Sequence, residues 1–125
     1  MFQIVFNEIS AAEISQMPTL EQLDLLSNFR VSPEDLESLD TQKRGSRFGK
    51  LEREGSTLYR YRANDVRIYF SVEGGNVLVH RVLTANTFAD FLYRSDLPMK
   101  SEDKALAKMG KFWELIDQGK QAKPV

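Results

Sequence analysis

The chain has no cysteine, and it has one histidine among its 125 residues. Without thiols it can form neither a disulfide nor a thiolate metal site, and a zinc site would have to combine the histidine with carboxylates. We therefore expect no structural metal and no cofactor.

Long apolar segments are also absent. No stretch approaches the roughly 20 consecutive apolar residues that cross a bilayer. The first residues, MFQIVFNEIS, lack the basic segment that begins a secretory signal. We expect a soluble, cytoplasmic protein without a membrane partner, whose 42% hydrophobic residues suffice for the core of one domain.

The net charge is only −1, but the charges are distributed unevenly along the chain. Residues 1–42 contain eight acidic residues and one basic residue, whereas residues 43–81 contain nine lysines and arginines and four acidic residues. Charged side chains mostly cover solvated faces. A β-strand, however, places alternate residues on one face and concentrates their charge there.

The first part of the chain predicts a strand and a helix. The run FQIVF, residues 2–6, is rich in β-branched and aromatic residues and is typical of a strand. Residues 7–17 then predict a helix with Asn7 as its N-cap, and Pro18 ends it.

Two further helices are predicted before the basic segment. Thr19 and Gln22 form the pattern of a capping box, and the leucines that follow have helical spacing, which predicts a stripe facing the core. Ser32 and Pro33 indicate the start of a short third helix. The leucines of the predicted stripe are Leu20, Leu23, Leu25 and Leu26.

Residues 57–83 change to an alternating pattern and predict an antiparallel meander of three strands. In TLYRYRA, residues 57–63, the two tyrosines fall on one face and the two arginines on the other. In VRIYFSV, residues 66–72, Ile68 and Phe70 oppose Arg67 and Tyr69. VLVHRVL, residues 77–83, is the third strand, and AND and the glycine hairpin EGGN are the turns.

Helical spacing returns after the meander. Residues 84–94 predict a helix through Phe88 and Phe91, and residues 101–119 predict one amphipathic helix that ends at Gly119. We therefore predict an α+β fold, with an N-terminal strand and helices on a twisted, mainly antiparallel sheet. A C-terminal helical extension, residues 95–125, is expected on or next to residues 1–94 within a single domain overall.

The meander resembles the RelE/ParE superfamily of bacterial toxins. In that family a pattern KL…yRyR…yRiiY…v…v…hR runs through the central strands, and KLEREGSTLYRYRANDVRIYFSV with VLVHRVL is similar to it. The similarity covers about residues 1–94 and implies a RelE-like fold in which helices cover one face of the sheet. The residues that carry it are Leu51, Tyr59, Arg60, Arg62, Arg67, Tyr69, His80 and Arg81.

The resemblance also implies a place in translation. RelE-type members bind the ribosome and cleave mRNA without a metal, ParE-like members act on DNA gyrase, and both are held inactive by an antitoxin. In a nuclease of this kind the groups around the phosphate would be Arg60, Arg67 and Arg81, with Tyr93 as a proton carrier. Contacts to RNA or to a protein partner would come from Lys50, Arg53, Arg60, Arg62, Arg67, Tyr69 and Arg81.

Two features depart from a nuclease. A guanidinium stays protonated and is a poor general base, which leaves Tyr93, Glu52 and His80 for proton transfer. His80 is expected on the opposite face from Arg81, because neighbours on a strand alternate. The pI of about 5.9 is also low for a protein that docks on ribosomal RNA.

Two functions therefore come first, and a ParE-like role that acts on DNA gyrase is a third. One is a regulator or inhibitor that binds a protein of the RNA-processing or translation machinery. The other is a ribosome-dependent mRNA endoribonuclease of a type II toxin–antitoxin system, with a cognate antitoxin. In either case we expect the arginines and Lys50 to converge on one concave surface that can contact RNA or a partner. Internal pairing with Glu52, Glu54 and Asp65 on adjacent strands is the alternative.

Overall fold

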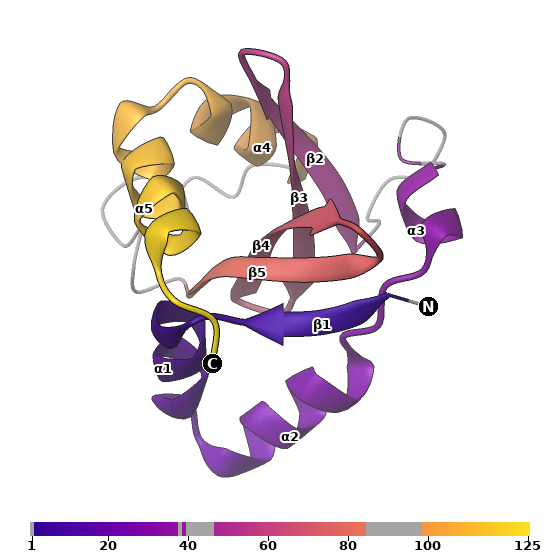
Figure 1. Cartoon of the computed structure of the whole chain (residues 1–125), viewed down its shortest axis with the longest axis vertical. Helices are drawn as coiled ribbons and strands as arrows, with labels where there is room; N and C mark the ends of the chain where they lie inside the picture. The colour runs from indigo at the N-terminus through magenta and orange to yellow at the C-terminus, as the bar shows by residue number, and fades with distance from the viewer. Residues whose placement is uncertain (1, 38, 40–46, 85–98) are drawn as a thin grey trace.

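The computed structural model describes residues 2–37, 39, 47–84 and 99–125, which form an α+β fold with helices on both faces of a five-stranded sheet (Figure 1). The described elements are β1 (Gln3–Phe6), α1 (Glu8–Ser15), α2 (Thr19–Asn28), α3 (Pro33–Glu37), β2 (Phe48–Arg53), β3 (Ser56–Ala63), β4 (Val66–Glu73), β5 (Asn76–Leu83), α4 (Met99–Ala107) and α5 (Gly110–Gln121).

The sheet has the strand order β1-β5-β4-β3-β2, in which β1 runs parallel to β5 and all other neighbours are antiparallel. The predicted strands at residues 2–6, 57–63, 66–72 and 77–83 are confirmed as β1, β3, β4 and β5. The predicted EGGN hairpin is also confirmed, since Gly74 and Gly75 adopt φ of 56° and 80° in the β4–β5 turn. The strand β2 was not predicted and adds a fifth member to the sheet.

One face of the sheet is covered by α1 and α2. Ile14 of α1, Leu25 of α2 and Phe29 just after α2 are buried against alternate residues of the meander. The sheet residues in this cluster include Tyr61, Ile68, Phe70, Val77, Val79 and Val82. The period-2 pattern of the sequence therefore places the expected apolar residues on this face.

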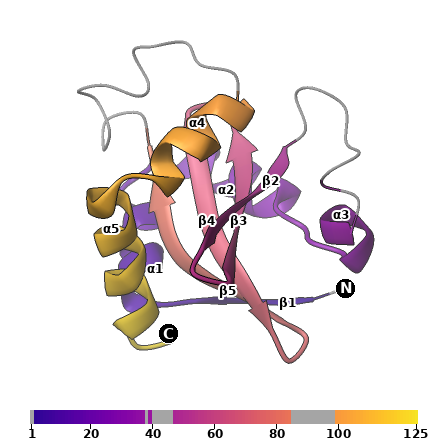
Figure 2. The same ribbon diagram turned by 90° about the horizontal axis from the view of Figure 1, so that it is seen from above.

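The opposite face is covered by α4 and α5. In Figure 2, α4 lies in front of the strands and α5 runs beside them. Leu106 of α4 and the α5 residues Phe112, Trp113 and Ile116 are buried there. They pack against Leu51, Leu58, Tyr69 and Leu83 of the sheet. Helices thus cover both faces, whereas the resemblance implied helices on one.

The α2 helix differs from its prediction in two ways. Pro18 precedes the helix and supplies no side-chain cap, while the Gln22 amide donates to the carbonyls of Ser15 and Met17. The predicted capping box of Thr19 and Gln22 is therefore wrong. The predicted inward stripe is also wrong in part, because Leu25 is 3% exposed but the other leucines of the helix face solvent.

The C-terminal region forms two helices where one was predicted. The chain leaves helical geometry at Lys108 and Met109, and Gly110, a poor helix former, begins α5. Gly119 lies inside α5 and does not end it, because the helix continues to Gln121. The helix predicted at residues 84–94 falls almost entirely outside the described residues.

No helix among the described residues is long and apolar enough to cross a membrane.

Candidate functional site

The strand register brings the arginines of the meander to one face of the sheet. Arg60 on β3 pairs with Tyr69 on β4, and Tyr69 pairs with Arg81 on β5, so these residues form a row across the strands. Arg62 and Arg67 pair with each other nearer the β3–β4 turn. This is the face that α4 and α5 cover.

Arg60 lies beneath α4 and is 2% exposed. Its Nη2 and Nε donate to the two carboxylate oxygens of Asp103, at 2.9 and 3.2 Å, and its Nη1 donates to the carbonyl of Arg47 at 2.8 Å. Gly49 on β2 makes room for this group, because a Cβ there would overlap the guanidinium. The chain itself therefore supplies the anion that Arg60 binds.

Arg67 is paired in the same way. Its Nε and Nη2 donate to the carboxylate of Glu102 at 3.1 and 3.4 Å, and its Nη1 donates to the Asn64 carbonyl at 2.8 Å. Both side chains of the pair are buried.

Burial raises the pKa of Asp103, the partner of Arg60, and the neighbouring Glu102 charge adds to this, although hydrogen bonds from Arg60 oppose the shift. Two adjacent carboxylates of α4 thus face two arginines of the sheet.

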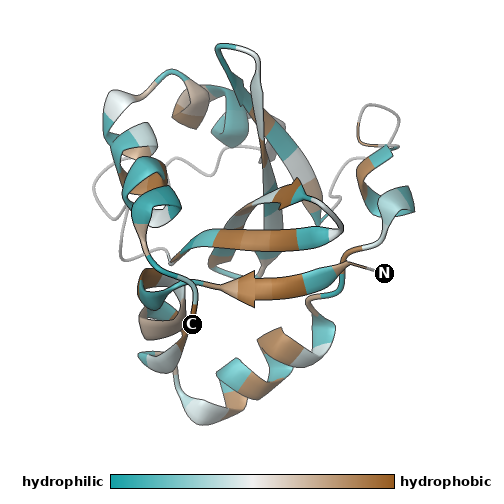
Figure 3. Ribbon diagram, viewed as in Figure 1, coloured by the Kyte–Doolittle hydropathy of each residue, from teal (hydrophilic) through white to brown (hydrophobic). Residues whose placement is uncertain are grey.

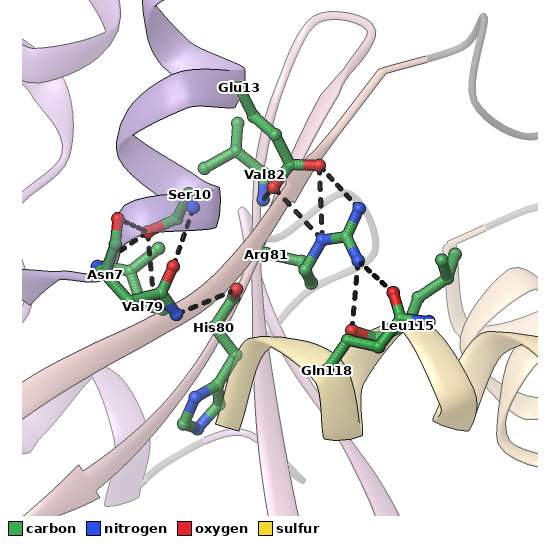
Figure 4. Close-up of polar contacts among 9 residues, drawn as sticks. All are labelled: Asn7, Ser10, Glu13, Val79, His80, Arg81, Val82, Leu115 and Gln118. Atoms are coloured by element: carbon green, nitrogen blue, oxygen red, sulfur yellow. Dashed lines mark hydrogen bonds and ion pairs between the residues drawn. The ribbon is translucent and has the colours of Figure 1, made fainter. Parts of the chain in front are cut away.

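Arg81 joins two helices at the other end of the row, as Figure 4 shows. Its Nε and Nη2 donate to the carboxylate of Glu13 on α1, with the shortest distance 2.9 Å from Nη2. Its Nη1 donates to the Leu115 carbonyl and to the Gln118 side chain of α5. Glu13 also accepts from the backbone N–H of Val82. This arginine therefore ties α1, β5 and α5 together.

The other predicted contact residues are more exposed, apart from Tyr69. Lys50 pairs with Glu52 at 3.8 Å on the surface. Arg53 forms a two-point ion pair with Asp117 of α5 and lies 4.4 Å above the Trp113 ring. Arg62 is exposed and donates from Nε to the Asn64 carbonyl.

Tyr69 and Tyr93 complete the predicted set. The Tyr69 ring is fully buried and lies edge-on to Phe112, with centroids 4.9 Å apart, so it cannot stack on a base. Tyr93 lies outside the described residues.

The expected open, concave cationic surface is therefore wrong for Arg60 and Arg67. Each binds a carboxylate of α4 under the cover of that helix, and Arg81 binds Glu13. Internal pairing was the alternative, but the acids come from helices and not from the adjacent strands. The acidic partners of these arginines were not predicted from the sequence: they are Glu13, Glu102, Asp103 and Asp117. The net charge of −1 indicates that a strongly basic segment is balanced by acidic residues elsewhere in the chain, and this was the signal that could have pointed to them.

His80 also departs from its prediction, because β5 contains a bulge. Tyr69 pairs with Arg81 and Phe70 with Val79, which leaves His80 as an extra residue. The insertion breaks the alternation, so that His80 and Arg81 both turn toward the α5 face. The His80 Nε2 lies 2.7 Å from the Ser71 hydroxyl. Burial, together with the nearby Lys120 charge, lowers the pKa of His80 to about 4.

Ser71 and His80 line a cavity of about 700 Å³ together with Lys120. The cavity lies at the ends of β3 and β4 that do not pair with each other, because the paired part of these strands ends at Tyr59 and Phe70. A neutral imidazole bonded to a hydroxyl is the basis of a serine nucleophile. Within the described part of the chain, however, no carboxylate hydrogen-bonds to His80 to orient it. The described residues also contain no group of three or more histidines and acids that could hold a metal.

The low pKa of His80 predicts a pH-dependent stability. The unfolded chain has the ordinary histidine pKa of 6.5, so between that pH and about 4 it binds a proton that the folded protein does not. The contribution of His80 to the free energy of unfolding is therefore constant above pH 6.5. It decreases as the pH falls from 6.5 toward 4, because only the unfolded chain binds the proton there. Because the chain has one histidine, its imidazole NMR signals should titrate with a midpoint near 4.

Replacing His80 with glutamine tests this directly. In His80→Gln the part of the pH dependence between 6.5 and 4 should disappear from urea unfolding curves. The variant keeps Asp103, so the contribution of this carboxyl to the pH dependence of stability should remain. A histidine midpoint near 6.5 in the wild type would contradict the buried environment.

Comparison with known proteins adds no identification, since neither a protein-family model nor a curated protein matches this chain.

Proposed function

We propose that this protein acts by binding another protein of RNA metabolism or translation, and that it does not cleave RNA in the form described above. The observation that carries the proposal is the pairing of Arg60 with Asp103 and of Arg67 with Glu102 beneath α4. The resemblance of the meander to the RelE/ParE superfamily supports a role in RNA metabolism or translation. The α+β fold with its five-stranded sheet is compatible with that resemblance.

The buried pairs argue against cleavage for an electrostatic reason. A metal-free nuclease stabilises the charge that develops on the phosphate with cations that the substrate can reach. Here the carboxylates of α4 occupy the hydrogen-bonding positions of Arg60 and Arg67. RNA could take their place only if α4 left the sheet, which would expose Leu106 and leave two carboxylates without partners.

The acidic N-terminal segment favours a protein partner over RNA. Residues 1–42 contain eight acidic residues and one basic residue. The α1 and α2 helices of this segment lie on the face opposite α4 and α5. Such a layer repels a polyanion within the Debye length of about 8 Å at physiological salt. A basic protein would be attracted by the same charges.

An assay with translating ribosomes tests the proposal. Added to a reconstituted translation reaction, the full chain is expected to leave the mRNA intact, as judged by primer extension, because its arginines are not accessible to phosphate. A RelE-type nuclease in a parallel reaction is the positive control. Codon-specific cuts made by the wild-type chain would contradict the proposal.

A nuclease covered by α4 is the second candidate, and the row of Arg60, Tyr69 and Arg81 favours it. The double variant Glu102→Gln/Asp103→Asn removes the two compensating charges and nearly preserves the side-chain shapes. If this variant cuts ribosome-bound mRNA while the wild type does not, α4 is an inhibitory cover. Circular dichroism should first show that the variant keeps its fold.

A further inference from the structure

The sheet opens between β3 and β4. The two strands pair next to the turn that joins them, and this pairing ends at Tyr59 and Phe70. Beyond these residues, positions 56–58 pair with β2 alone and positions 71–73 pair with β5 alone. In Figure 1 the β2–β3 turn points to the top of the view and the β4–β5 turn points to its side, so the two hairpins diverge. We call the cavity of about 700 Å³ between them the β3–β4 cleft.

Each wall of the cleft is the edge of a strand. A strand has two edges, and both carry backbone N–H and C=O groups that need hydrogen-bond partners. For residues 56–58 and 71–73, one edge is paired inside the β2–β3 or the β4–β5 hairpin. The other edge borders the cleft, and within the part of the chain that the structure describes it pairs with no strand. The cleft therefore presents two rows of backbone donors and acceptors.

One side of the cleft is apolar. Its lining comes from both faces of the sheet, because the cleft lies where the sheet is open. On the face of α1 and α2, four side chains that line the cleft also pack against the core of that face and are only partly buried. These side chains are Phe2, Leu36, Tyr59 and Val72. They leave apolar surface available to a ligand.

The other side of the cleft, on the α5 face, is polar. Ser71 and His80 are hydrogen-bonded to each other there, and Lys120 lies close enough for its charge to lower the pKa of His80. Two carboxylates also line the cleft: Glu73 follows Ser71 by two positions toward the β4–β5 turn, and Glu37 ends α3. The polar side thus has a cation beside Ser71 and a carboxylate nearer the turn.

These features match an extended peptide. Such a peptide carries N–H and C=O groups along both of its edges, as the two walls require. Its side chains alternate between two faces, so every second one can reach the apolar side and the others can reach the polar side. Figure 3 shows hydrophobic and hydrophilic bands of this kind along the strands of the sheet itself. A helix satisfies its own backbone groups and would leave both walls unpaired.

We propose that the β3–β4 cleft binds an extended segment of a partner protein as an added strand. The segment carries apolar side chains at alternate positions and an acidic side chain at the intervening position that faces Lys120. Three residues of a strand span roughly 10 Å, which matches the three residues of each wall. This inference rests on the proposed function as a binding protein, and it names the surface and the chemistry of the partner.

Binding of fluorescent heptapeptides tests the proposal with the full chain. In each of four peptides the odd positions are all valine, all isoleucine, all leucine or all phenylalanine, the even positions are polar, and the central residue is aspartate. Fluorescence anisotropy should show that at least one of them binds, and at least about tenfold tighter than its controls.

Three controls separate the contributions to binding. A scrambled peptide of equal composition lacks the alternation, and a peptide with lysine in place of aspartate reverses the charge that faces Lys120. In the third control, alternate backbone amides are N-methylated, on one edge or on the other, which removes the donors of that edge. Insertion between two strand edges predicts that methylation of either edge weakens binding.

Two readouts locate the bound peptide. Hydrogen exchange should slow at backbone amides within residues 56–58 and 71–73, because they gain partners in the complex. The NMR signals of His80, the single histidine, should shift over the same range of peptide concentration, because this side chain lines the cleft.

Variants of the chain examine the two sides of the cleft. Val72→Thr nearly preserves the side-chain shape but places a hydroxyl on the apolar side, and it should weaken binding about fourfold, the equivalent of one buried methyl group. Lys120→Gln should reduce the preference for aspartate over lysine. Lys111→Gln changes an exposed lysine of the same helix and should bind both peptides like the wild type. Thermal unfolding should first show that each variant keeps its fold.

Several results would overturn the proposal. These are failure of all four peptides to bind, binding that survives N-methylation of both edges, or binding without slower exchange at residues 56–58 and 71–73. Equal binding of the lysine and aspartate peptides would overturn the acidic character assigned to the partner. The mRNA assay is independent of these outcomes, because intact mRNA without peptide binding removes only the cleft proposal. Cleaved mRNA with peptide binding removes only the proposed function.

Discussion

Replacing Arg60 with methionine is expected to lower the free energy of unfolding by about 3 to 5 kcal/mol, the usual cost of breaking one side of a buried ion pair. Asp103, whose side chain is 8% exposed beside Arg60, would lose the guanidinium that holds its charge. Burial already raises the pKa of this carboxyl, and loss of the Arg60 hydrogen bonds would raise it further, so the variant should bind a proton on folding at a higher pH than the wild type does. Urea unfolding at several pH values measures both effects.

Two further variants isolate the ion pair. Arg62→Met changes an exposed arginine on the same strand and should alter stability by no more than about 0.5 kcal/mol. Arg60→Met/Asp103→Leu removes both charges and should recover part of the loss, because no uncompensated carboxylate remains. Equal stability of Arg60→Met and Arg62→Met would mean that Arg60 is not structural and that its charge is held for a partner.

Changing Gly119 to alanine is expected to cost about 2 to 3 kcal/mol, the range for overpacking a close contact. A Cβ at this position would overlap the backbone carbonyl of His80, which cannot turn aside as a side chain can. The Asn7 amide also donates to the carbonyl of His80 at 3.2 Å, as Figure 4 shows. The same amide donates to the carbonyl of Gly119 at 2.8 Å. Moving α5 away from β5 would therefore break the hydrogen bond from Asn7 to Gly119 as well.

Gly110 supplies the matched control for Gly119. It is the first residue of the same helix, and a Cβ there would meet open space. Gly110→Ala should leave stability unchanged or slightly higher, because alanine favours the helix. Thermal unfolding of the two variants compares them, and the His80 NMR signals should shift only in Gly119→Ala. Equal losses in both variants would contradict a specific contact between α5 and β5.

Local patterns in the sequence were sufficient for most of the secondary structure. The N-cap at Asn7 is an example, since its side chain accepts from the N–H of Ser10 as the type of residue predicts. The strands of the meander follow from alternation and from the turn residues between them. These features depend on residues within a few positions of each other, which a sequence displays directly.

The structure differs from the sequence-based prediction where contacts between residues far apart in the chain determine the local structure. The leucines of α2 have core-like spacing, but Leu25 alone among them is buried in the core and the other three are exposed to solvent. The bulge at His80 cannot be read from VLVHRVL, because it depends on how β5 pairs with β4. The strand β2 likewise forms through its pairing with β3.

The sequence by itself determined that the arginines of the meander share a face, because alternation along a strand and the turns between strands are local properties. Only the tertiary structure decided what that face does. Asp103 and Glu102 are separated from Arg60 and Arg67 by 43 and 35 positions, and Glu13 is 68 positions from Arg81. Charge pairing over such separations is set by where the helices pack, so a basic strand pattern that indicates a phosphate-binding surface becomes, beneath α4, a set of buried ion pairs.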